Sequence, residues 1–285
     1  MKKLFKFYYY VRWNLILIRL IGSLKYVKNF FKKGLIKSLP FDSTTQINNI
    51  GYSQGPKIDR SIVEEIMNIY KERGDKIIPK PTGSPFVNLI NSNDISVNNP
   101  IIKLAFSKEI LDAAIDYFGG KLSLDSIQLL YSFTTNNELR ESQYWHKDFG
   151  DSKSFHAITY LNDVNKIEDG PFVFINKIDT KKIKKSIFIR RINDRDLINE
   201  LGDENKIKYF YGGAGSTVFV DPSVCYHYGS RCKNYRYAIF ITFNSNTPYT
   251  NPIKLVTENK SKLLNVATQL RPDLSSKLLQ SIIYN

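Results

Sequence analysis

Eight short segments rich in β-branched and aromatic side chains lie between residues 124 and 244, each bounded by turn residues. They are 124–135, 142–149, 154–162, 170–176, 206–210, 215–220, 224–229 and 235–244. Such short, regularly spaced segments are typical of a β-sandwich or barrel rather than a helical fold. We therefore predict that this part of the chain forms one β-barrel core.

Helical patterns flank the predicted strands. A capping box at Ser61 and Glu64 predicts a helix that runs to Glu72 and stops at Gly74. Its predicted buried face is Ile62, Ile66, Ile69 and Tyr70. Further helices are predicted over 100–118, 258–270 and 273–283, and loops over 40–58 and 75–99, the second of which can border the active site. The predicted fold is mainly β with flanking α: a double-stranded β-helix (jelly-roll or cupin-like) barrel, braced by N- and C-terminal helices.

The positive charge of the chain is concentrated at its N-terminus. Residues 1–40 hold ten of the 41 Lys and Arg residues and none of the 27 Asp and Glu, so only +4 of the net +14 belongs to the remainder. We predict a basic, aromatic-rich helical segment over 1–40 that either packs on the barrel or makes peripheral contact with an anionic membrane surface. Residues 41–285 are predicted to form a single domain, with its β core at about 124–244 and a lid-like insertion at 177–205.

No targeting or nucleic-acid motif is visible in the sequence. The apolar run at 13–21 is interrupted by Asn14 and Arg19 and is too short to span a bilayer. Two cysteines, Cys225 and Cys232, are too few for a disulfide scaffold and fit a reducing compartment. We predict a cytoplasmic protein, with association at the inner membrane surface left open, and no nucleic-acid partner.

The pattern Tyr-Trp-His-Lys-Asp at 144–148 predicts a metal site. On an extended segment, side chains two apart point the same way, so His146 and Asp148 can project into one space. A distant His227, brought back by the fold, would complete one face of ligands and leave the opposite face open. Two histidines and one carboxylate are the facial triad of non-haem Fe(II) oxygenases, although zinc hydrolases often use similar ligands.

The sequence around these residues resembles the phytanoyl-CoA dioxygenase-like family of Fe(II)/2-oxoglutarate-dependent oxygenases. The resemblance extends from about Leu124 to Phe243. Its blocks are Tyr-Trp-His-Lys-Asp-Phe at 144–149, Ala-Ile-Thr-Tyr-Leu-Asn-Asp-Val at 157–164, Glu-Asp-Gly-Pro-Phe-Val-Phe-Ile at 168–175, Gly-Ala-Gly-Ser-Thr-Val-Phe-Val-Asp at 213–221, His-Tyr-Gly-Ser at 227–230 and Arg-Tyr-Ala-Ile-Phe-Ile-Thr-Phe at 236–243. The Pro-Gly-Ser-His that often follows the strand-turn-strand block is replaced by Asn-Lys-Ile-Asp at 176–179, which leaves the substrate open.

The resemblance implies a reaction and a set of roles. His146, Asp148 and His227 would hold Fe(II), with 2-oxoglutarate and O2 as co-substrates and hydroxylation of a C–H bond as the outcome. Arg236 is the expected partner of the far carboxylate of 2-oxoglutarate, because a guanidinium binds a carboxylate through two parallel bonds, and Arg231 is its rival. Tyr131 or Ser132 would add a hydrogen bond.

His156 is expected to be a packed or surface histidine, not a ligand. The substrate is an unidentified small molecule, or one linked to a lipid or glycan. Two other functions stay open: a catalytically silent jelly-roll binding module and a zinc-dependent hydrolase on the same barrel.

Overall fold

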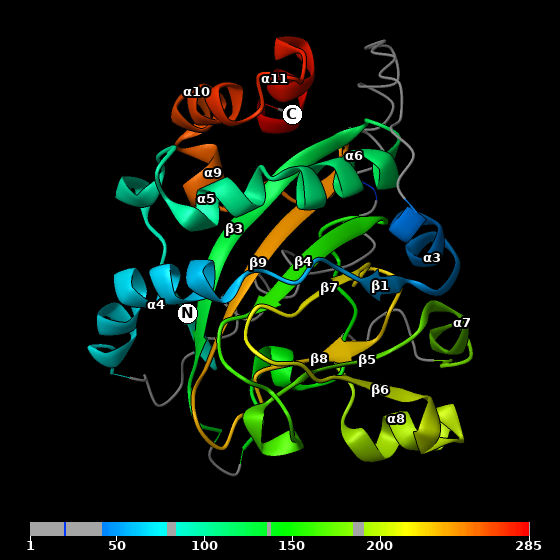
Figure 1. The fold of residues 1–285 in the computed structure, drawn as a ribbon. Helices are drawn as coiled ribbons and strands as arrows, with labels where there is room; N and C mark the ends of the chain where they lie inside the picture. The colour runs from blue at the N-terminus through cyan, green and yellow to red at the C-terminus, as the bar shows by residue number, and fades with distance from the viewer. Residues whose placement is uncertain (1–19, 21–41, 79–83, 136–137, 185–190, 285) are drawn as a thin grey trace, which may run out of the picture.

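The computed structural model describes residue 20 and residues 42–78, 84–135, 138–184 and 191–284. The predictions made for residues 1–40, including the membrane contact, therefore lie outside the described residues apart from Leu20. The described part is built from antiparallel sheets with helices packed around them (Figure 1). Its mainly β character with flanking helices agrees with the prediction.

The larger sheet has the strand order β1–β7–β4–β9–β3–β2, and each neighbouring pair is antiparallel. Its strands are β1 (Tyr52–Gln54), β2 (Phe86–Asn88), β3 (Leu122–Ser132), β4 (Ser154–Tyr160), β7 (Thr217–Val220) and β9 (Arg236–Ser245). The longest pairing joins β3 to β9 and sets Ser132 opposite Arg236 at one end. A shift of register between Leu124 and Ser126 leaves Asp125 as an extra residue in β3.

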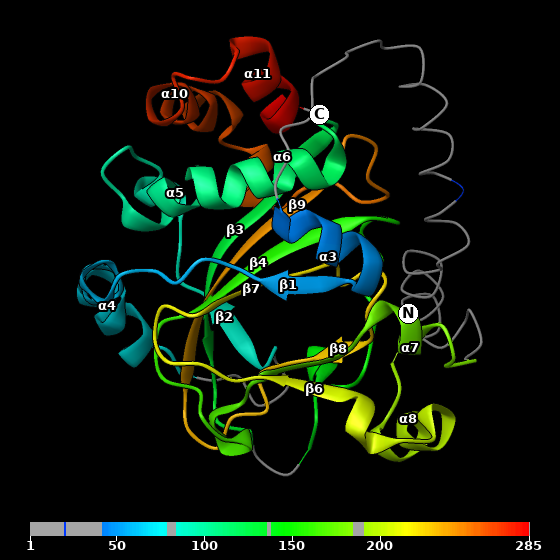
Figure 2. The ribbon, with the colours of Figure 1, turned by 45° about the vertical axis from the view of Figure 1, so that its right-hand side comes forward.

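A smaller sheet has the order β6–β5–β8 and is also antiparallel. Its strands are β5 (Phe172–Ile175), β6 (Ile207–Phe210) and β8 (His227–Tyr228). It lies on the opposite side of the larger sheet from helices α5 (Pro100–Ala105) and α6 (Ala113–Phe118), as both ribbon views show (Figures 1 and 2). The space between the two sheets is where the predicted site residues meet.

Strand β9 shows how the alternation of side chains divides the molecule. Tyr237, Ile239, Ile241 and Phe243 join the large buried cluster under the helices, which we call the helix-side core. Ala238 faces the other way, into a cluster between the two sheets. Burial of each large apolar side chain stabilises the fold by roughly 1.5–3 kcal/mol, which fixes the register of β9. Arg236 is therefore placed on the inter-sheet face.

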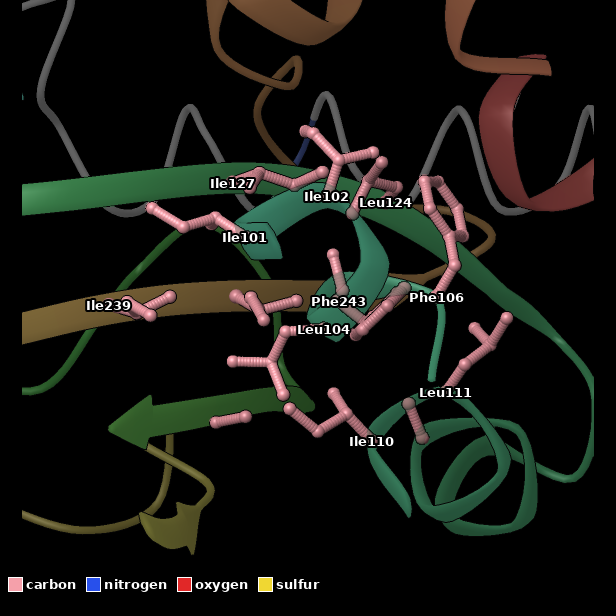
Figure 3. Packing of buried hydrophobic residues seen from close by; sticks show 14 of the residues in the cluster. Ile101, Ile102, Leu104, Phe106, Ile110, Leu111, Leu124, Ile127, Ile239 and Phe243 are labelled. Atoms are coloured by element: carbon pink, nitrogen blue, oxygen red, sulfur yellow. The ribbon is translucent and has the colours of Figure 1, made fainter. Parts of the chain in front are cut away.

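The helix-side core is formed where helical residues pack onto β3 and β9 (Figure 3). The predicted helix over 100–118 is present but divided into α5, a π-helical turn η2 (Lys108–Asp112) and α6. Ser107 starts the second part, because its Oγ accepts the backbone N–H of Ile110. The helix ends as predicted at Gly119, whose φ of 59° is in the left-handed region.

The prediction for helix α4 (Arg60–Asp75) is correct in position and wrong in its ends. Asp59, not Ser61, is the N-cap, and no side-chain capping bond forms. Gly74 lies inside the helix, which ends one residue later at Asp75. Glycine is needed at this position because a Cβ would lie 2.2 Å from the Tyr237 hydroxyl. The buried face is Val63, Ile66, Tyr70 and Gly74, while Ile69 is exposed.

Several short elements lie where loops were predicted, so those loop predictions are wrong. Helix α3 (Asp42–Ile50) packs the fully buried Ile47 into the helix-side core, and β1 and β2 are three-residue strands that pair with β7 and β3. A 3₁₀ turn η1 spans Ser92–Asp94. The predicted strand at 142–149 is also wrong, since a 3₁₀ turn η3 (Glu141–Gln143) is followed only by isolated bridges.

The C-terminal helices are α9 (Lys254–Thr257), α10 (Lys260–Leu270) and α11 (Ser276–Tyr284). They bury Leu263, Val266, Leu279 and Ile282 in the helix-side core. This agrees with the predicted bracing role of the C-terminal segment. No helix within the described ranges is long and apolar enough to cross a membrane.

The segment 177–205, of which the structure describes 177–184 and 191–205, packs against the small sheet through those residues. It holds α7 (Lys177–Thr180) and α8 (Asp194–Leu201), then a 3₁₀ turn η5 (Glu204–Lys206); a further turn, η4 (Ile167–Asp169), precedes β5. Helix α8 is capped at its start by Asn193, whose side chain accepts the Asp196 N–H, and ends at Gly202 in the left-handed conformation. Its buried residues Leu197 and Leu201 join a cluster with Trp145 and Tyr228.

Candidate metal centre

Three predicted site residues lie together in the structure. The carboxylate Oδ1 of Asp148 is 3.5 Å from His146 Nε2 and 3.6 Å from His227 Nε2. One ligand atom from each residue lies within 4.8 Å of the others, so the group could hold a metal ion. The two imidazole rings are 4.3 Å apart between centroids.

The backbone brings His146 and His227 together directly. The two residues exchange both hydrogen bonds, at 3.0 Å from His146 N to His227 O and at 2.9 Å in the reverse direction. Trp145 makes the equivalent exchange with Ile192 at 3.0 and 2.9 Å, and Asp148 N donates to Pro222 O at 2.9 Å. The segment is thus held extended by three different partners instead of one ladder, and His146 and Asp148 still point to the same side.

The rest of each imidazole is oriented by a backbone carbonyl. His146 Nδ1 lies 2.8 Å from Tyr144 O, and His227 Nδ1 lies 3.0 Å from Cys225 O. A carbonyl can only accept, so Nδ1 carries the proton in each ring and Nε2 keeps its lone pair for a metal. Burial, reinforced for His146 by the neighbouring His227, lowers the pKa of His146 and of His227 to about 4. Both are therefore neutral at neutral pH, as metal ligation requires.

The donor set fits a divalent metal. Two ligands about 2.1 Å from one ion and at right angles lie about 3 Å apart, close to the separations seen here. The ligands come from one side, two from the extended segment and one from β8. Such a set of two histidines and one carboxylate suits Fe(II) and leaves positions for other ligands.

Arg236 is almost fully buried, at 1% exposure, on the inter-sheet face of β9. Its Nη1 donates to Gly170 O, and its Nη2 donates to Ser230 Oγ at 3.1 Å. Its Nε is buried without a hydrogen-bond partner. Gly170 lies just before β5, and Phe172 of β5 has its ring 5.4 Å from that of His227. A buried guanidinium with an orphaned donor, bonded to Ser230 three residues after His227, favours an anionic ligand at this position.

Ser230 is a site residue that the sequence reasoning missed. It adopts a φ of 62°, a left-handed conformation that is uncommon for serine. Its hydroxyl lies 2.9 Å from Ser132 Oγ, and its carbonyl accepts from Gln143 and Thr135. The only sequence signal was its place in the His-Tyr-Gly-Ser block.

Of the residues predicted near Arg236, Ser132 lies on its side of the sheet, and Arg231 and Tyr131 are engaged elsewhere. Arg231 is used elsewhere: both terminal nitrogens donate to Asp194 at 2.9 Å, and its guanidinium lies 3.5 Å over the Tyr228 ring. Ser132 shares the inter-sheet face with Arg236. Tyr131 points to the helix side, where its ring packs 4.9 Å from Tyr237.

His156 lies closer to the centre than expected. Its Nε2 is 3.6 Å from Asp148 Oδ2, and its side chain is 14% exposed. His156 is thus packed and outside the ligand group, as predicted, although its nearness to Asp148 was not foreseen. Burial lowers its pKa, and the charge of Asp148 partly opposes this. Asp151 accepts backbone N–H groups from Ser245 and Ser152 and therefore has a structural role.

A further carboxylic acid faces the same region. Burial, together with the charges of Asp148 and Asp151, raises the pKa of Asp125 to about 7. Its Oδ1 accepts a hydrogen bond from Asn244 at 3.0 Å. This proximity was not predictable from the sequence, because Asp125 is placed by the bulge in β3.

A pocket of about 140 Å³ opens at His146 and Asp148. Two aromatic rings, Phe86 and Phe149, line it, as do the ionic side chains of Glu141, Lys147 and Arg191. Phe86 comes from the segment 75–99, which was expected to border the site. Arg191 comes from the segment 177–205, so that segment also reaches the pocket.

No protein-family model and no curated protein sequence matches this chain. Solved structures do. EctD from S. alaskensis with bound Fe is similar over 77% of this chain and 82% of that chain, at 16% identity and a TM-score of 0.53. The same protein with 2-oxoglutarate and 5-hydroxyectoine gives 75% and 78%, 16% identity and 0.51. HygX from Streptomyces hygroscopicus with nickel, 2-oxoglutarate and hygromycin B gives 73% and 88%, 12% identity and 0.51. At these identities the likeness shows a shared fold.

Proposed function

We propose that this protein is an Fe(II)- and 2-oxoglutarate-dependent dioxygenase that hydroxylates a C–H bond of a small molecule. The observation that carries the proposal is the convergence of His146, Asp148 and His227 beside a buried Arg236 whose Nε is orphaned. The shared fold with EctD and HygX, whose solved structures hold Fe or nickel and 2-oxoglutarate, supports it.

The finer assignments belong to the same proposal. The two facing antiparallel sheets support a double-stranded β-helix, and the motif blocks favour the phytanoyl-CoA dioxygenase-like family. The lid-like role of 177–205 is supported by Arg191, which lines the pocket. A cytoplasmic location and membrane contact through residues 1–40 stay predictions, to be tested by fractionation of the full chain.

Each residue has a defined part in this account. His146, Asp148 and His227 hold the metal through Nε2, Oδ1 and Nε2, with both Nδ1–H groups fixed on carbonyls. Arg236, with Ser230 and Ser132 beside it, binds the far carboxylate of 2-oxoglutarate. When bound, the iron and co-substrate supply oxidation of a C–H bond by O2, with succinate and carbon dioxide released. The chain orients the reactants and excludes water, because the arginine and both histidines are largely buried.

Arg236 also separates the proposal from its rivals. A zinc-dependent hydrolase needs the three ligands and a water but has no use for a buried guanidinium with an unmet donor beside them. A silent binding module would retain metal and 2-oxoglutarate without turnover. The first would be supported by zinc in protein purified without added metal, the second by binding without succinate release.

The test is succinate formation from 2-oxoglutarate under air with Fe(II), followed across a panel of acyl-CoA, amino-acid, osmolyte and glycan substrates. The wild type is expected to release succinate, and Asp148→Ala to lose this activity while keeping its fold. Asp163→Ala, which removes a carboxylate that accepts the Ala214 N–H far from the triad along the chain, is the matched control. Equal turnover by wild type and Asp148→Ala would remove Asp148 from the site.

A further inference from the structure

All three histidines of this chain converge on one carboxylate. His146 and His227 lie at Oδ1 of Asp148, whereas His156 Nε2 lies 3.6 Å from Oδ2. His156 comes from a different element, strand β4, where it pairs in register with Thr242 of β9 and Val220 of β7. The larger sheet therefore brings His156 to Asp148, whereas His146 and Asp148 come from the extended segment and His227 from β8.

The position of His156 is set by packing. Its side chain is 14% exposed, and its ring meets Phe240 edge-on with centroids 6.4 Å apart. The described part of the chain gives its ring nitrogens no hydrogen bond to another residue. A neutral imidazole always has one N–H to donate. The nearby acceptor is the Asp148 oxygen that faces away from the other two histidines.

We propose that His156 is a positioning residue for Asp148, donating from Nε2 to Oδ2 when a metal occupies the triad. This inference rests on the proposed function, because it needs Asp148 to be a ligand. With Oδ2 engaged, Asp148 presents Oδ1 alone to the metal, which keeps the carboxylate monodentate. The remaining coordination positions then stay available to co-substrate and oxygen.

Groups that hold a metal-ligating side chain typically contribute 10–100-fold to metal affinity. His156→Phe keeps a ring of similar size and removes the donor. His156→Gln keeps a donor on a side chain of comparable reach. Thr242→Val, next to His156 in register on β9, changes the same surface without touching Asp148 and is the matched control.

The experiment is a titration of metal-free full-length protein with Co(II), whose visible absorption reports both affinity and ligand arrangement. We expect His156→Phe to bind Co(II) 10–100-fold more weakly than wild type, with altered bands. His156→Gln should recover most of the affinity, and Thr242→Val should match the wild type. If His156→Phe does not fold, as judged by circular dichroism, His156→Leu takes its place.

Two results would overturn the inference. One is a Co(II) affinity of His156→Phe equal to that of wild type. The other is an equal loss of Co(II) affinity in His156→Gln and His156→Phe. Neither result would contradict the proposed function, provided that wild type binds Co(II) and Asp148→Ala does not. A wild-type protein that fails to bind Co(II) would instead refute the metal site itself. The two failures are thus distinguished in one set of titrations.

Discussion

Arg236 offers the sharpest test of the co-substrate site. Arg236→Met removes the guanidinium and keeps an unbranched side chain in the same buried space. Each charge-assisted hydrogen bond to a carboxylate contributes about 1.5–3 kcal/mol, so loss of a two-bond fork should cost about 3–6 kcal/mol. At about 1.4 kcal/mol per factor of ten, the Kd of 2-oxoglutarate should rise by at least about 100-fold.

Arg231→Met is the matched control for this experiment. It removes a guanidinium five residues before Arg236, in the connection between β8 and β9, and this guanidinium is paired with Asp194. The expected result is a less stable protein with an unchanged Kd for 2-oxoglutarate. The Kd of Arg236→Lys for 2-oxoglutarate should lie between those of Arg231→Met and Arg236→Met, because lysine keeps the charge but loses the planar fork.

The assay is an anaerobic titration of the Fe(II)-loaded protein with 2-oxoglutarate, followed through the weak visible charge-transfer band. Circular dichroism of each variant confirms the fold. Arg236→Met binding 2-oxoglutarate as tightly as wild type would refute the assignment of Arg236. Weakened binding by Arg231→Met alone would transfer the role to its rival.

Two further predictions concern stability. In metal-free protein the pKa of Asp125 is raised to about 7 in the folded state. Between about pH 4 and 7 the folded state therefore binds more protons than the unfolded state. The contribution of Asp125 to stability thus falls as the pH rises through that window. Asp125→Asn should therefore be more stable than wild type at about pH 8, by up to about 4 kcal/mol, and no more stable below about pH 4. Urea unfolding at both pH values checks this. An equal gain in stability at both pH values would contradict it. Gly74→Ala should destabilise the fold by about 1–3 kcal/mol, because its Cβ would lie 2.2 Å from the Tyr237 hydroxyl, and a wild-type melting temperature would disprove the close contact.

The sequence predicted those features that depend on local pattern. In β3, β4, β7 and β9, successive side chains point alternately to the two faces of the sheet, and the short runs of β-branched and aromatic residues in the sequence indicate these strands. The spacing of His146 and Asp148 was informative for the same reason, since an extended segment places both on one side whether or not it pairs in a ladder.

The features that the sequence did not predict depend on partners distant along the chain. Strands β1 and β2 are three residues long and exist because β7 and β3 pair with them. Gly74 was predicted to stop its helix, but it is required inside the helix because Tyr237 occupies the space that a side chain would need. Three-residue edge strands and close packing leave no periodic signal in the sequence.

His156 shows the same limit within the candidate site. Its distance from Asp148 depends on the pairing of β4 with β9 and β7, not on its own sequence neighbours. Ser230 is similar, because its left-handed backbone and its contact with Arg236 arise only when the turn between β8 and β9 closes. Sequence identified the chemistry of the centre, and tertiary contacts supply the groups around it.

The most direct test of the account is anaerobic Fe(II) titration of metal-free wild type, Asp148→Ala and His227→Ala, measured by calorimetry. The account predicts one Fe(II) per wild-type chain and a large loss of affinity in both variants, with all three proteins folded. Wild type that takes up no Fe(II), or variants that bind it as tightly as wild type, would contradict the claim that these three side chains hold a metal.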